Sequence, residues 1–184
     1  MKELSEHILD IAQNSMAAGA AHVAITLTED DNGKLTVVIE DDGRGMAPEL
    51  LASASDPFTT TRTTRKMGLG LPFFQMAAEL TGGGMSLRSA PGAGTTVIAV
   101  FDLSHLDCPP IGAIADTIAL LVQGNPDIDI AYRHITPRGR SDLFTKEMRQ
   151  ALGEEISLAE PAVFSWIQAT LSEQEAQIEG ADLL

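Results

Sequence analysis

Apolar residues near the start of the chain recur at the spacing of a helix. The positions that share one face are Leu4, Ile8, Ile11 and Ala12, at i, i+4, i+7 and i+8. Gly19 follows this stripe, and glycine commonly ends a helix. We therefore expect an amphipathic helix that Gly19 terminates.

The period changes to two in four later segments, which predicts four strands. Val23, Ile25 and Leu27 alternate with other residues in the first segment, and residues 34–42 repeat the alternation after the turn DDNGK. The stretches MSLRSA and TTVIAVF, separated by PGAG, form a second pair. A loop that includes APELLASAS and a helix that starts near Pro72 lie between the pairs. This order favours a mostly antiparallel sheet with helices on one face.

The pattern changes after Asp102. The expected elements are a helix over 111–124, a strand over 127–135, a loop over 136–141, a helix that ends at Gly153 and a helix over 157–178. We expect the last helix to bury Trp166 on its apolar face. We assign residues 1–102 to one domain and residues 103–184 to a small α/β C-terminal extension of unknown role.

Charge and composition restrict the classes of partner. Twelve Lys and Arg stand against 26 Asp and Glu, for a net charge of -14, and neither half of the chain is basic. Nucleic acid binding draws on Lys and Arg, so it has little electrostatic support. The single cysteine, Cys108, excludes an internal disulfide and a cysteine-based zinc cluster. No stretch resembles a signal peptide or a membrane span, so we expect a cytoplasmic protein with no membrane partner.

Two short motifs in the first half carry candidate chemistry. Asp10 and Asn14 are four apart on the first helix, and a carboxylate beside an amide oxygen suits magnesium and a water. Asp41, Gly43 and Gly45 form a D-x-G-x-G turn, where an aspartate can accept from an amine such as that of adenine. Taken alone, the first motif also fits a solvated helix face and the second an ordinary turn.

A second glycine-rich turn, Gly68 to Leu71, runs directly into the helix near Pro72. Backbone N–H groups at a helix N-terminus bind phosphate. Arg62, Arg65 and Lys66 precede this turn and can add contacts to phosphate oxygens. The alternative interpretation is a solvated basic loop.

The order and spacing of these motifs resemble the GHKL superfamily of ATP-binding domains, found in gyrase, a heat-shock chaperone, histidine kinases and a mismatch-repair protein. DIAQN is similar to its N box, DDGRG and GLGL to two glycine boxes, DPFTTTR to its phenylalanine box and lid, and PGAGTT to its last box. The resemblance covers about residues 1–102 and is closest to the histidine kinases, in a standalone form. It implies a Bergerat fold, an α/β two-layer sandwich.

The resemblance also implies roles for single residues. Asn14 would ligate magnesium, Asp41 would accept the adenine amine, and Asp10 would be the catalytic residue, which orients the acceptor or a water. The other implied cofactor-binding residues are Gly43, Gly45, Met46 and Thr95 near the base, Phe58, Arg62 and Lys66 in the lid, and Gly68, Leu69, Gly70 and Leu71 at the phosphate end. The implied cofactors are ATP and Mg²⁺.

Several positions depart from the family pattern. Asp10 stands where the family usually has glutamate, which is one methylene longer, and a shift of ~1 Å can cost about a hundredfold in rate. Ala17 replaces a residue that is basic in kinases, and Lys66 replaces a glycine. His22 and His134 lie at predicted strands, outside any phosphoacceptor motif, and are expected to be structural.

Two functions from different classes follow. The first is a standalone signalling protein of histidine-kinase-like ATPase type that acts in trans on a protein partner, as a histidine- or serine-type kinase or a slow ATPase. The second is a nucleotide-gated binding or regulatory module with little or no catalysis. A DNA-transacting ATPase conflicts with the charge. The partner, the phosphoacceptor and the oligomeric state, a homodimer included, stay open.

Overall fold

The protein is described by a computed structural model that covers residues 2–54, 70–153 and 155–180. Its helices are α1 (Leu4–Ala17), α2 (Pro48–Ala54), α3 (Gly70–Leu80), α4 (Ile114–Gly124), α5 (Thr145–Leu152) and α6 (Pro161–Glu179). Its strands are β1 (His22–Glu29), β2 (Lys34–Asp41), β3 (Gly84–Ser89), β4 (Thr95–Asp102), β5 (Asp129–Thr136) and β6 (Gly139–Phe144). No helix among these residues is long and apolar enough to cross a membrane.

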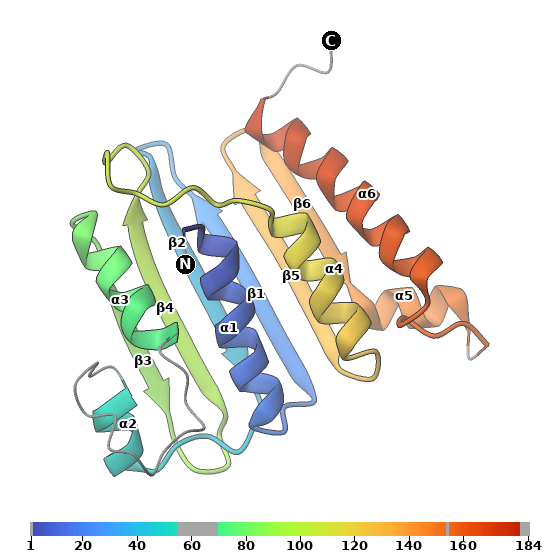
Figure 1. Ribbon diagram of the computed structural model, residues 1–184, viewed down its shortest axis with the longest axis horizontal. Helices are drawn as coiled ribbons and strands as arrows, with labels where there is room; N and C mark the ends of the chain where they lie inside the picture. Colours follow the sequence, from blue (N-terminus) through green and yellow to red (C-terminus); the bar gives the residue numbers. More distant parts are fainter. Residues whose placement is uncertain (1, 55–69, 154, 181–184) are drawn as a thin grey trace.

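The strands form one six-stranded sheet in the order β3-β4-β2-β1-β5-β6. Every neighbouring pair is antiparallel except β1 and β5, which are parallel. Helices α1, α3, α4 and α6 lie across one face of this sheet (Figure 1). The prediction of a mixed, mostly antiparallel sheet with helices on one face is therefore confirmed, as is the α/β two-layer sandwich.

One core lies between the helices and the sheet. The period-two residues Val23, Ile25 and Leu27 of β1 are buried against it, because alternate side chains of a strand point to one face. From the helix layer, Ile8 of α1 and Phe74 of α3 enter the same cluster. The alternation read from the sequence therefore identifies the buried face of the sheet.

The sheet continues beyond residue 102. Strand β5 pairs with β1 along its length, and β6 pairs with β5. Helix α4 packs on both α1 and α6, and Ile118, Tyr132 and Ile167 belong to the same buried cluster as Leu4. The division into a domain and an extension stays a prediction, and the structure shows one sheet and one core on both sides of it.

Three local predictions are wrong. Residues 139–141, expected in a loop, begin strand β6, and APELLASAS contains helix α2. Trp166 is 56% exposed rather than in the core. The buried stripe of α6 instead starts with Val163, Ile167 and Leu171, at i, i+4 and i+8, and this spacing turns Trp166 toward solvent.

Candidate nucleotide site

A cavity of about 390 Å³ opens between α1 and the ends of β2 and β4. It brings together six residues predicted from separate motifs: Asn14, Asp41, Gly45, Met46, Leu71 and Thr95. Gly43 lies beside them, because its N–H donates to Asp41 Oδ1. Phe58, Arg62, Lys66, Gly68 and Leu69 lie outside the described residues.

Asp41 is the last residue of β2 and the centre of this arrangement. Ser15 of α1 donates its hydroxyl to Asp41 Oδ2 at 2.6 Å, and the Gly43 N–H donates to Oδ1 at 2.9 Å. Thr95 is the register partner of Asp41 on β4. A carboxylate held by two donors has a fixed orientation, so its remaining lone pairs can point to a set place in the cavity.

The glycine turn after Asp41 is shaped by a close approach of the backbone. Gly45 has a φ of +66°, a conformation that glycine adopts without strain. A Cβ at Gly45 would lie 1.9 Å from the carbonyl oxygen of Ala90. The turn at residues 90–94 therefore packs directly on the D-x-G-x-G turn, and only glycine fits at this position.

The side chain of Asp10, on α1, lies against the first residue of α3 and does not line the cavity. A Cβ on Gly70, the first residue of α3, would lie 1.7 Å from Asp10 Oδ2. This oxygen is buried and accepts no hydrogen bond in the described part of the chain. An unpartnered buried oxygen costs stability, which is typical of a group kept for chemistry. Asp10 and the cavity residue Asn14 stand one helical turn apart on α1.

The Asn14 amide and the Asp10 carboxylate both offer hard oxygen ligands, which magnesium prefers. Magnesium often uses only one or two ligands from the protein. The described residues contain no cluster of three or more His, Cys, Asp or Glu that could hold a metal by itself. Because Asp10 Oδ2 is packed against Gly70 outside the lining of the cavity, a magnesium ion in the cavity would be held by Asn14 and the phosphates of a nucleotide. This donor set fits the predicted cofactor.

Sequence reasoning missed several residues of the site. Ser15 was not singled out because its partner, Asp41, is 26 positions away, and the contact depends on how α1 packs on the sheet. Arg44 lines the cavity, and its guanidinium has no carboxylate partner among the described residues.

His7, one turn before Asp10, is buried against Phe74 with ring centroids 5.4 Å apart. Burial lowers the pKa of His7, which favours its neutral form.

Comparison with known proteins places this geometry in a family. A family model described as "Histidine kinase-, DNA gyrase B-, and HSP90-like ATPase" matches residues 1–105. The chain belongs to this ATPase family. The match contains every predicted site residue, together with the elements whose residues line the cavity: α1, β2, α2, α3 and β4.

Curated relatives of the chain include histidine kinases. The chain is 35% identical over 100 residues to the tetrathionate sensor histidine kinase TtrS of Salmonella typhimurium, covering 53% of this chain and 17% of that protein. It is 32% identical over 101 residues to the histidine protein kinase DivJ of Caulobacter vibrioides, covering 52% and 17%. The chain thus spans about a sixth of the length of these relatives.

A solved structure extends the likeness in fold. The crystal structure of the N-terminal domain of a DNA repair protein matches with a TM-score of 0.55 and 15% identity, covering 78% of this chain and 52% of that one. The matched 78% of the chain is longer than the 105 residues of the ATPase family match. The shared fold therefore includes part of the chain beyond that match.

Proposed function

We propose that this protein binds Mg²⁺-ATP in the cavity beside Asp41 and transfers the γ-phosphoryl group in trans to a partner protein. The observation that carries the proposal is the Asp41 carboxylate, which Ser15 and Gly43 orient at the cavity. The residues that line this cavity lie within the match to the ATPase family. Asp41 accepts the adenine amine, and Thr95 lies opposite it on β4.

The residues on α1 serve the phosphate end in this proposal. Magnesium neutralises charge on the phosphates when it is bound, and Asn14 is its protein ligand. Asp10 lies at the N-terminus of α3, where orphan N–H groups favour anions. The acceptor oxygen or nitrogen of the partner attacks the γ-phosphorus, the bond to the ADP oxygen breaks, and Asp10 takes the acceptor's proton.

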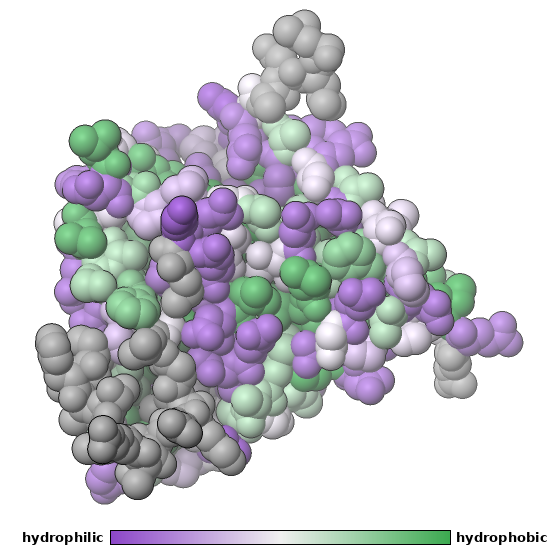
Figure 2. All heavy atoms as spheres, in the orientation of Figure 1, coloured by the Kyte–Doolittle hydropathy of each residue, from purple (hydrophilic) through white to green (hydrophobic). Residues whose placement is uncertain are grey.

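An exposed apolar stripe on α3 supports a protein partner. Phe73, Met76 and Leu80 stand at i, i+3 and i+7, and their side chains are 39%, 49% and 60% exposed. Green, hydrophobic atoms are visible over α3 at the left of Figure 2. A stripe with helical spacing suits the groove or helix of another protein. It lies on the helix that begins beside Asp10, so a docked partner would be near the phosphates.

Asp10→Asn separates the chemistry from nucleotide binding. We expect the wild type to transfer label from γ-³²P-ATP to a partner protein, and the variant to do so about a hundredfold more slowly, because an amide cannot take a proton. Affinity for ATP should change less than about threefold, since the adenine contacts stay. Asp31→Asn, an exposed aspartate in the β1–β2 turn, is the matched control and should behave as wild type.

A second function is favoured by the position of Asp10. Its Oδ2 atom is packed against Gly70 instead of lining the cavity, and its side chain is short for the role. In this alternative, ATP binding orders a docking surface while catalysis is slow or absent. If wild type saturated with ATP transfers and hydrolyses no more phosphate than Asp10→Asn, this alternative replaces the kinase.

A further inference from the structure

The sheet face opposite the helices carries a groove of about 410 Å³. It lies where β2 ends and β1 and β5 begin. Its lining includes Ala24, Ala131 and Phe144 on the strands and Lys146 and Glu147 on α5. The strand neighbours of the two alanines are buried beneath the helices, so the alanines themselves point to the other face.

The groove arises from one row of side chains across four strands. The register places Glu40 of β2, Ala24 of β1, Ala131 of β5 and Phe144 of β6 side by side. Two alanines in the middle of the row leave a hollow between a carboxylate and an aromatic ring. In the neighbouring row, the Arg133 guanidinium lies 5.4 Å from the centroid of the Phe144 ring. This ring is therefore already in contact with one cation.

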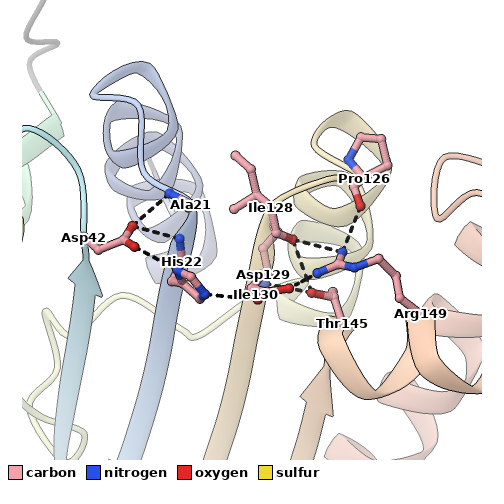
Figure 3. A network of polar contacts seen from close by, with 9 residues as sticks. All are labelled: Ala21, His22, Asp42, Pro126, Ile128, Asp129, Ile130, Thr145 and Arg149. Atoms are coloured by element: carbon pink, nitrogen blue, oxygen red, sulfur yellow. Dashed lines mark hydrogen bonds and ion pairs between the residues drawn. The ribbon is translucent and has the colours of Figure 1, made fainter.

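One wall of the groove is a closed polar network (Figure 3). The N–H groups of Ala21 and His22 both donate to Asp42 Oδ1 at 2.8 Å, and the His22 ring lies between Asp42 Oδ2 and Asp129 Oδ2, at 2.7 and 3.1 Å. Asp129 also pairs with Arg149 of α5. These groups satisfy one another, so the wall has a fixed shape and its carboxylates are partly neutralised.

Two carboxylates at the rim have no such partner. Glu40 and Glu147 are exposed, and neither makes a hydrogen bond or ion pair with its side chain in the described part of the protein. The basic groups that line the groove are Lys146 and the ring of His22. Five carboxylates line it: Glu40, Asp41, Asp42, Asp129 and Glu147. The local charge is negative, and the floor is apolar, so the groove suits a cation on an apolar stem.

We propose that this groove docks an arginine side chain presented by an extended segment of a partner protein. The methylene stem of arginine would cover Ala24 and Ala131, and its planar guanidinium would pair with Glu40 or Glu147. The surface is separate from the apolar stripe on α3, and it requires neither bound nucleotide nor phosphoryl transfer. Its failure would therefore leave the proposed function untouched.

The probe is the peptide Ac-Gly-Arg-Gly-Arg-Gly-NH₂, titrated into the full chain labelled with ¹³C at alanine methyl groups. We expect the Ala24 and Ala131 resonances to shift in a saturable way. Ala131→Leu fills the groove and should weaken binding at least tenfold, and the double variant Glu40→Gln with Glu147→Gln should weaken it about tenfold. The latter changes only exposed side chains, so it keeps the test valid if Ala131→Leu does not fold.

The matched control removes two negative charges elsewhere. Asp31→Asn with Glu173→Gln has the same net charge as the groove variant, and it should bind the peptide as wild type does. Equal weakening in both double variants would mean diffuse attraction to an acidic surface and would overturn the proposal. Alanine shifts that follow the protein concentration without peptide would assign the groove to a second copy of the chain, which also overturns it.

Discussion

At the scale of single residues, the site rests on contacts between positions far apart in the sequence. The D-x-G-x-G motif predicted Asp41 and Gly45, because glycines at fixed positions in a turn after a strand indicate the backbone conformation of that turn. Ser15 carries no such signal. Its role follows from the packing of α1 on the end of β2, where its hydroxyl reaches Asp41 Oδ2 at 2.6 Å.

Ser15→Ala tests whether this contact positions Asp41. The variant removes one of two donors that orient the carboxylate, so we expect ATP to bind about tenfold more weakly while the protein stays folded. Calorimetric titration with Mg²⁺-ATP measures the change. Ser165→Ala removes a comparable hydroxyl from the exposed side of α6 and should bind as wild type. Unchanged affinity in Ser15→Ala would show that Asp41 needs no support from α1.

At the scale of elements, most helices and strands were predicted, whereas helix α2 and strand β6 were not. Only Ser141 and Leu143 of β6 are buried, so this strand carries almost no hydrophobic alternation. In α6 a polar cluster accompanies the apolar stripe. The ring of buried His134 on β5 lies between Glu175 Oε2 of α6, at 2.7 Å, and Glu29 Oε1 of β1, at 3.1 Å. Glu175 Oε1 also accepts from the Tyr132 hydroxyl at 2.9 Å.

This cluster makes stability depend on pH. Burial alone lowers the pKa of His134, but the hydrogen bond and charge of Glu175 and the charge of Glu29 outweigh it and raise the pKa. Both ring nitrogens face carboxylate acceptors, so the imidazolium is the form that binds both. The stabilisation is fully present below the pKa of about 6.5 of an unfolded histidine and is lost as the pH rises through the higher pKa of the folded state.

His134→Gln should lower the free energy of unfolding by about 3 kcal/mol at pH 6, because it leaves the buried Glu175 carboxylate without a cation. The deficit should shrink as the pH rises through the raised pKa of folded His134, because the wild type then loses the proton. Urea unfolding at several pH values measures both effects. His105→Gln, at a partly exposed histidine, is the control and should keep the wild-type pH dependence. A deficit that does not shrink at any pH above 6.5 at which the wild type stays folded would rule out the imidazolium.

At the scale of the whole molecule, the first half of the sheet was predicted and its continuation was not. Hairpin partners such as β1 and β2 are joined by a short turn that the sequence marks. The parallel pairing of β1 with β5 joins segments about a hundred positions apart, with no local signal. The ATPase family match ends at residue 105, while the sheet and core continue through β5, β6, α4 and α6.

The most direct measurement is calorimetric titration of Mg²⁺-ATP and ADP into the wild type, Asp41→Asn and Asp31→Asn. We predict that Asp31→Asn binds each nucleotide with the affinity of the wild type, and that Asp41→Asn binds each at least about a hundredfold more weakly. An amide at position 41 lacks the charge that Ser15 and Gly43 orient, and it can present a donor to the adenine amine. Equal affinity in wild type and Asp41→Asn, or no binding by folded wild type, would contradict the nucleotide site.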